Sequence, residues 1–276
     1  MPPGLRRPLP TRPVTHGDYL MSIFRSIRSA LSVAILAPLP VFGQSAADRI
    51  AAGDRDYAAL KAASAYENYQ AAVAADSTNA EALGKASRSA VDLGESEPDA
   101  NKRKALFRSG EMYARRAVAA NPRDAENHFH LARALGRAAL NVGVRDRVKY
   151  ATEIRSLGLE ALKLDPNHPG ALHVMGAWNA EIMRLNGVER FFAKNMLGGK
   201  TFSEANWKDA IAYMEKAVQV DPVRLTHKLD LGKIYMDTKD MAKAREMLEA
   251  VVNGAQTDVN DPGYKKEAAE LLKKIK

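Results

Sequence analysis

The sequence predicts an all-α fold in which antiparallel helical pairs stack into a right-handed solenoid. Two observations lead to this prediction. Residues 225–251 carry small and large apolar side chains at the spacing of one closely packed helical pair. Upstream, four more Ala-rich helical segments end at similar polar turns, most of which contain a proline that stops one helix and opens the next. These turns occupy residues 75–79, 120–124, 164–168 and 220–222.

Residues 225–251 match the tetratricopeptide (TPR) unit, W-x2-L-G-x2-Y followed by A-x3-F, with only the tryptophan replaced. The positions concerned hold Lys228, Leu231, Gly232, Tyr235, Ala244, Leu248 and Val251. Small residues at Gly232 and Ala244 let two antiparallel helices approach closely, and the larger side chains fill the seam between them. One such pair cannot bury its apolar face alone, so it needs neighbouring pairs.

The neighbouring pairs are predicted from the residues at the template's small-large-small positions, counted back from each turn. The second helices carry, in chain order, Ala65-Tyr69-Ala72, Gly110-Ala114-Ala117, Ile154-Gly158-Ala161 and Ala210-Met214-Ala217. The turns, at residues 77, 122, 166 and 222, lie farther apart than the roughly 34 residues of a regular repeat. We therefore expect about five pairs in an irregular TPR-like array, with lengthened helices or insertions.

Several ordered sequence blocks carry a more specific resemblance. They are residues 102–132, residues 143–165, His173-x2-Gly176-x-Trp178 with Glu189-Arg190, Ala193 and Leu197-Gly198 after it, and a helix started by Ser203 that holds Ala210 and residues 217–222. With these blocks, the chain resembles the regulator of microtubule dynamics (RMDN) family, divergent TPR proteins with lengthened helices, over residues 57–276. The chain departs from the family at Phe129 and His130, where a Trp-Tyr pair is expected, and at Gly187, which replaces a second tryptophan.

The resemblance implies a shape more strongly than an activity, because one fold hosts many functions. Animal members of the family are associated with microtubules and with mitochondrial or endoplasmic reticulum membranes. The family implies no firmly established catalytic activity. We expect the same of this chain, and no enzyme.

The segment from Met21 onward has the order of a secretory signal peptide: a basic start, an apolar run at residues 30–43, and small residues at 44–47 before the acidic Asp48. The apolar run contains two prolines and is shorter than the roughly 20 residues of a membrane-spanning helix. We therefore expect export and no transmembrane segment.

Cleavage is expected after Gly43 or after Ala47. Residues 1–20 are then a disordered tail or a misassigned start, residues 21–47 the signal peptide, and residues 48–276 the helical domain. The mature protein would be periplasmic or secreted. The same leader, rich in arginine and poor in acidic residues, also fits a mitochondrial transit peptide.

Composition excludes several classes of function. The net charge of +8 lies partly in the leader, so residues 48–276 carry 36 basic and 32 acidic side chains, which is no nucleic-acid-binding composition. The chain has no cysteine, and therefore no disulfide framework, thiol nucleophile or lipid-anchor cysteine.

Two motifs could indicate chemistry, and both are better explained by structure. Residues 197–201 (LGGKT) resemble the end of a phosphate-binding loop, but Lys194 stands where its first glycine belongs. The alternative without a bound ligand is a helix cap at Gly198 or Gly199, followed by a new helix start at Ser203 or Asn206. The histidines lack the spacing of a metal site, and we expect His173 to pack beside Trp178. The histidines of the helical domain are His128, His130, His168, His173 and His227. Neither a cofactor nor a metal is expected.

One set of residues is a candidate binding site. In TPR proteins the residue after the Leu-Gly position of each first helix tends to face the concave groove, and aligning the units places a basic stripe with one aromatic there. The stripe comprises Arg88, Arg133, Arg137, Trp178 and Lys233. Such a groove could hold an acidic or C-terminal peptide segment through charge-assisted hydrogen bonds. In the alternative interpretation these residues pair with neighbouring Glu81, Asp92, Glu126 and Glu181 and are solvated or structural.

The sequence therefore predicts a non-catalytic scaffold that binds a partner peptide or protein through its concave TPR groove. The partner is a protein, with an acidic segment favoured, and not a nucleic acid. Two alternatives stay open: a structural subunit of an envelope or membrane-associated assembly, and a mitochondrial protein resembling the microtubule regulators. The sequence leaves the oligomeric state undetermined.

Overall fold

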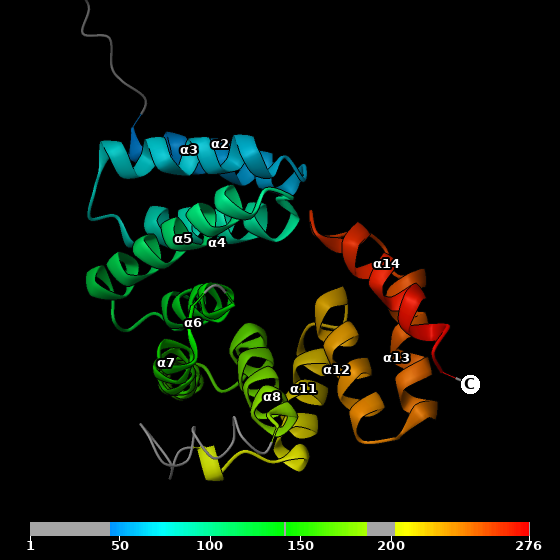
Figure 1. Ribbon diagram of the computed structural model, residues 1–276. Coiled ribbons are helices and arrows are strands. Elements are labelled where there is room, and N and C mark those ends of the chain that lie inside the picture. The colour runs from blue at the N-terminus through cyan, green and yellow to red at the C-terminus, as the bar shows by residue number, and fades with distance from the viewer. Residues whose placement is uncertain (1–44, 141, 187–201, 276) are drawn as a thin grey trace, which may run out of the picture. The chain divides into compact units, whose positions relative to one another are not determined.

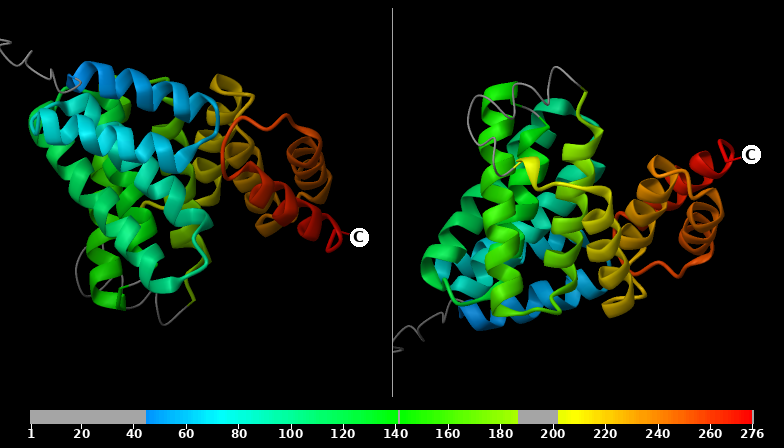
Figure 2. Two further views of the ribbon diagram at one scale, coloured as in Figure 1. Left: turned by 90° about the horizontal axis from the view of Figure 1, so that it is seen from above. Right: turned by 90° about the horizontal axis from the view of Figure 1, so that it is seen from below.

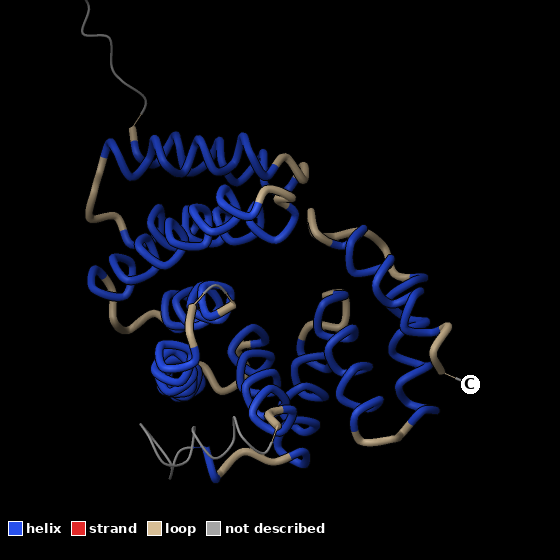
Figure 3. The backbone as a smooth tube through the Cα atoms, in the orientation of Figure 1, coloured by secondary structure: helices blue, strands red, loops and turns tan. Residues whose placement is uncertain are grey.

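A computed structural model describes residues 45–275, apart from Asn141 and residues 187–201. The described chain is helical (Figures 1 and 3). Its helices are α2 (Ala46–Ala58), α3 (Ala62–Ala75), α4 (Ala80–Ser96), α5 (Ala100–Ala120), α6 (Ala125–Ala139), α7 (Val144–Leu164), α8 (Pro169–Arg184), α11 (Trp207–Val220), α12 (Leu225–Asp237), α13 (Met241–Asn253) and α14 (Asp261–Leu272). The predicted fold class is confirmed.

The helices pack as five antiparallel pairs in chain order, α2–α3, α4–α5, α6–α7, α8–α11 and α12–α13, and α14 covers the last pair. The second helices end at Ala75, Ala120, Leu164 and Val220, where the sequence predicts the turns. Figure 1 shows the pairs following one another along an arc, and Figure 2 gives the same stack from above and below. The first helices touch in succession from α4 through α6, α8 and α12 to α14.

The predicted triplets form the seams of these pairs. Tyr69 and Met214, the large members of two triplets, are fully buried, as are the alanines on either side of each. In the last pair, a Cβ added to Gly232 would lie 3.0 Å from Leu248 Cγ, so a larger residue requires the Leu248 side chain to shift. The main core cluster lies around this pair and includes Leu229, Leu231 and Val251.

Polar side chains cap the helix starts. Asn79, Asp99 and Asp124 accept backbone N–H groups at the N-termini of α4, α5 and α6, which satisfies donors that the helix leaves unpaired. The start expected at Ser203 or Asn206 falls at Asn206, whose Oδ1 accepts the Asp209 N–H at 2.8 Å. The glycine cap expected at Gly198 or Gly199 lies outside the described residues.

The described part of the chain contains no helix that combines the length and the apolarity needed to cross a membrane. The signal peptide assigned to residues 21–47 falls almost wholly outside the described residues, which begin at Ser45. Ser45 is the N-cap of α2: its hydroxyl accepts the Asp48 N–H at 3.1 Å, and the Asp48 carboxylate accepts the Ser45 N–H at 3.1 Å.

Candidate interaction surface on the inner helices

Charged and hydroxyl side chains from the first helices of several pairs meet in one group, which we call the inner polar cluster. It consists of Tyr57 (α2), Arg88, Asp92 and Glu95 (α4), Arg133 and Arg137 (α6), Arg224 (the N-cap of α12), Asp258 and Asn260 (before α14), and Tyr264 (α14). Three of the predicted groove residues, Arg88, Arg133 and Arg137, belong to it.

Arg133 is the centre of the cluster. Its Nη2 donates to Asp92 Oδ1 at 2.6 Å and to Glu95 Oε1 at 2.7 Å. The neighbouring Arg137 donates from Nε to the same Glu95 oxygen at 3.1 Å. These residues reach one another because Asp92 and Glu95 lie on one face of α4, and Arg133 and Arg137 are one turn apart on the facing side of α6. The structure therefore agrees with the alternative interpretation, in which Arg133 pairs with Asp92.

The carboxylates in this cluster are buried, Asp92 completely and the Glu95 side chain to 8% exposure. Burial tends to raise the pKa of Glu95, but attraction to Arg133 and Arg137 and the hydrogen bond from Tyr264 outweigh it and lower this pKa. Burial raises the pKa of Asp92 against the attraction of Arg133, and the nearby Asp258 and Glu95 add to the rise. Of Asp92 and Glu95, Glu95 is therefore the carboxylate that stays charged more firmly.

The segment before α14 completes the cluster from the far end of the chain. The Asn260 side-chain amide donates to the Asp92 backbone carbonyl at 3.1 Å, and the Tyr264 hydroxyl donates to Glu95 Oε2 at 2.5 Å. The Arg224 guanidinium pairs with Asp258 at 2.7 Å. Burial and the Glu95 charge raise the pKa of Tyr264, which keeps its hydroxyl a donor.

Arg88 has a different environment. Its guanidinium lies over the Tyr57 ring, 3.7 Å from the ring centroid, and its Nη2 donates to the Tyr69 hydroxyl at 3.3 Å. Within the described chain, no carboxylate lies within ion-pair distance of Arg88, and its buried Nε has no hydrogen-bond partner. Arg88 is thus a cation positioned by aromatic side chains rather than by an acid.

The other two predicted groove residues lie elsewhere. Lys233 pairs with Asp230 at 3.1 Å and with Glu267 of α14 at 2.7 Å. Trp178 is 5% exposed, donates from Nε1 to the Ala151 carbonyl of α7 at 2.7 Å, and stacks on Phe202. Its ring is a core side chain between α7 and α8. Alignment to the TPR pattern gives its place on α8 but not its rotation toward α7.

The histidines make contacts in two places, between α8 and α12 and around Glu126. His173 Nδ1 lies 2.8 Å from His227 Nδ1 and His173 Nε2 lies 3.2 Å from Asp230, so His173 faces α12 rather than Trp178, which faces α7. Burial lowers the pKa of His227 to about 2, and the positive charge of neighbouring His173 lowers it too. His130 and His168 both contact Glu126. In the described ranges, no group of three or more side chains could hold a metal ion.

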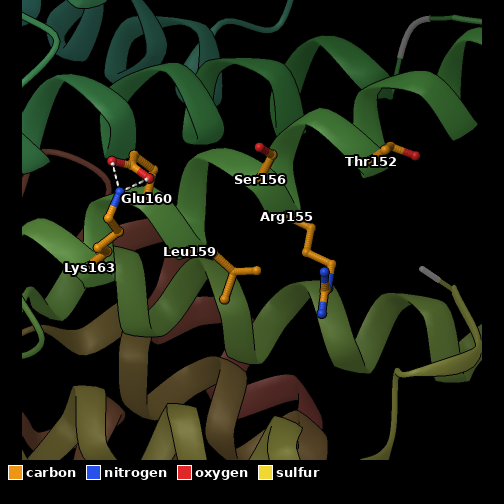
Figure 4. Close-up of a pocket in the computed structure, with 6 residues that line it drawn as sticks. All are labelled: Thr152, Arg155, Ser156, Leu159, Glu160 and Lys163. Atoms are coloured by element: carbon orange, nitrogen blue, oxygen red, sulfur yellow. Dashed lines mark hydrogen bonds and ion pairs between the residues drawn. The ribbon is translucent and has the colours of Figure 1, made fainter. Parts of the chain in front are cut away.

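The outer face has an open hollow of about 360 Å³ along α7. Figure 4 shows its lining side chains, Thr152, Arg155, Ser156, Leu159, Glu160 and Lys163, all of which come from this one helix. Lys163 pairs with Glu160 at 3.0 Å, and Arg155 is bound to Glu204. Enzyme sites usually bring polar groups from several elements into one pocket, and this hollow does not.

Sequence reasoning missed the residues that complete the inner polar cluster from the C-terminal end. Asp258, Asn260 and Tyr264 lie in a stretch that resembles an ordinary turn and amphipathic helix, with Asp261-Pro262 as its start signal. Their contact with α4 joins residues 168 and 169 positions apart. No local pattern reports such a contact.

Comparison with known proteins supports the fold. A solved thermophilic TPR protein of Thermus thermophilus superimposes with a TM-score of 0.59 at 17% sequence identity, over 82% of this chain and 99% of that one. The pilF protein of Pseudomonas aeruginosa gives a TM-score of 0.48 at 13% identity, over 83% of this chain and 90% of that one. The first of these likenesses confirms the TPR-like architecture.

Sequence comparison gives the family. Regulator of microtubule dynamics protein 1 of Bos taurus is 26% identical over 200 residues, which cover 72% of this chain and 62% of that protein. The Homo sapiens protein of the same name is 26% identical over 191 residues, or 69% of this chain and 60% of that protein. The chain thus spans less than two thirds of the length of these relatives. The family model described as "Regulator of microtubule dynamics protein 1-3" matches residues 45–276. The chain therefore belongs to the regulator of microtubule dynamics protein 1-3 family.

Proposed function

We propose that this protein is a non-catalytic scaffold that binds an acidic segment of a partner protein on the inner face of its solenoid. A TPR-like fold in this family is the architecture of a protein interaction scaffold. To this we add that the inner face is the binding groove and that the partner segment is acidic. Both additions rest on one observation: the inner polar cluster holds more cations than carboxylates. Its four arginines, Arg88, Arg133, Arg137 and Arg224, face three acids.

The excess positive charge is carried by Arg88 and Arg137. Within the described residues, the carboxylate paired with Arg137 is Glu95, which Arg137 shares with Arg133, and the Arg137 side chain is 38% exposed. Arg88 acts electrostatically on Asp54 and Glu126, but those acids are bound to Lys85 and to histidines. A carboxylate from a partner could therefore form charge-assisted hydrogen bonds with both arginines.

The test uses a fluorescein-labelled decapeptide of aspartate and glutamate, with binding measured by fluorescence anisotropy. We expect Arg88→Gln and Arg137→Gln each to weaken binding severalfold, and added salt to weaken binding to the unmodified protein. Arg133 is left intact because removing it would leave the buried Asp92 without its ion-pair partner. The control is Arg115→Gln, since Arg115 is 43% exposed and pairs with Glu111 and Glu153 of α5 and α7.

Absence of peptide binding, or binding that responds equally to the inner-face and control substitutions, would refute the proposal. Equal loss in all three variants would indicate nonspecific attraction to a basic protein. Circular dichroism of each variant verifies that the helices are retained.

We also propose that a leader ending at Gly43 is removed on export to the periplasm or cell exterior. The cap of α2 favours cleavage after Gly43 over cleavage after Ala47. Cleavage after Ala47 would remove Ser45, and with it both hydrogen bonds of the capping box.

A further inference from the structure

The segment of residues 257–264, which we call the C-terminal clasp, occupies part of the face where the partner is proposed to bind. It runs from the loop after α13 through the first turn of α14, and Figure 1 shows the start of α14 beside the end of α4. Asn260 is 6% exposed and Asp258 8%, which is unusual burial for polar residues near a chain end. The clasp is therefore packed into the inner face.

The clasp makes the kinds of contact that a bound peptide makes. Asn260 donates to a backbone carbonyl of α4, Tyr264 donates to Glu95, and Asp258 pairs with Arg224. Its own conformation is pre-formed, because the buried Asp261 carboxylate accepts the N–H groups of Thr257 and Asp258 at 2.7 and 2.8 Å. Backbone and side-chain hydrogen bonds combined with one ion pair are typical of peptide recognition.

The contact between the clasp and α4 is polar, whereas the apolar side of α14 packs elsewhere. Ala268, Leu271 and Leu272 of α14 belong to the core around α12 and α13, and the Tyr264 ring packs against the same core. Breaking only the hydrogen bonds of Asn260 and Tyr264 to α4 would therefore release the clasp from α4 while α14 stays packed on α12 and α13. Segments held by few apolar contacts open at the lowest free-energy cost.

We propose that the C-terminal clasp is an intramolecular ligand of the inner face, and that it competes with a protein partner for the face that carries Arg88 and Arg137. The clasp then regulates the site: the apparent affinity of the inner face for the partner is its intrinsic affinity multiplied by the fraction of molecules in which the clasp is open. This inference rests on the proposed function and names the competitor that controls it.

The test weakens the clasp in the full chain. Asn260→Ala combined with Tyr264→Phe removes both hydrogen bonds to α4 and keeps the aromatic ring. The matched control is Tyr150→Phe, which removes a hydroxyl contact to Glu111 of 3.3 Å between α7 and α5 on the outer side. Affinity for the labelled Asp/Glu decapeptide is measured for all three proteins. We expect the double variant to bind roughly tenfold more tightly than the unmodified protein, and the control to be unchanged.

Hydrogen exchange verifies that the substitutions release the clasp: amides of residues 257–264 should exchange faster in the double variant and at the original rate in Tyr150→Phe. Unchanged exchange in the double variant would overturn the inference, as would equal peptide affinity of the double variant and the unmodified protein. If no protein binds the peptide, the proposed function fails, and the gating inference falls with it. Equal affinities would therefore refute the clasp inference alone, whereas absence of peptide binding in every protein would refute the proposed function.

Discussion

At the scale of single residues, the glycine of the TPR unit has the clearest physical role. Gly232 faces Leu248 and the Ala244 carbonyl of α13 across the seam of the last pair. By contrast, Gly136 of α6 has open space where a side chain would project. The two glycines are therefore a matched pair for testing whether close packing, rather than helix propensity, requires a glycine.

We predict that Gly232→Leu destabilises the protein by about 1–3 kcal/mol or more, because extra carbon atoms force α12 and α13 apart. Gly136→Leu should be neutral or slightly stabilising, since leucine is the better helix former. Urea denaturation followed by circular dichroism measures both. Equal midpoints for Gly232→Leu and the unmodified protein would show that the seam tolerates the larger side chain.

Helical elements are held in register by the ion pairs between α4 and α6 as well as by apolar seams. Buried pairs add little net stability over apolar replacements, but removal of one partner leaves a charge without compensation. Asp92 has zero exposure and contacts Arg133, Tyr57 and, through its backbone carbonyl, Asn260. The exposed pair of Arg115 with Glu153 joins α5 to α7 without such burial.

We predict that Asp92→Ala lowers the free energy of unfolding by about 1–3 kcal/mol, because Arg133 keeps Glu95 but loses its other buried partner, and the Tyr57 hydroxyl loses its acceptor. Glu153→Ala, which removes an acid that is 37% exposed, should cost about 1 kcal/mol or less. Thermal and urea unfolding of both variants test this difference. Similar losses for the two would mean that water reaches the inner polar cluster and screens it.

The arrangement of whole helices shows how far sequence reasoning extends. The ends of α3, α5, α7 and α11 were predicted because proline and capping residues act locally. Trp178 was placed on the correct helix with the wrong exposure, because burial depends on α7 and Phe202. The orientation of a side chain about its helix is decided by the neighbouring helices.

For the whole molecule, we predict that the mature N-terminus is Gln44. Intact-mass analysis of the protein purified from its own cells measures this directly. The capping box of Ser45 and Asp48 survives in that species, so its α2 should remain helical to the first turn. A protein that retains Met21 and is found in the cytosol would contradict export, and a start at Asp48 would contradict the choice of site.

The sequence by itself determined the helical pairs, their seams and the family, because these depend on interactions between residues close along the chain. One short turn brings Gly232, Ala244 and Leu248 together, and their spacing can be read directly from the sequence. Only the tertiary structure decided that Arg133 is neutralised inside the protein, that Trp178 is in the core, and that Asn260 and Tyr264 return to α4. These contacts depend on the accumulated rotation of five stacked pairs, to which every helix contributes and which no local pattern encodes.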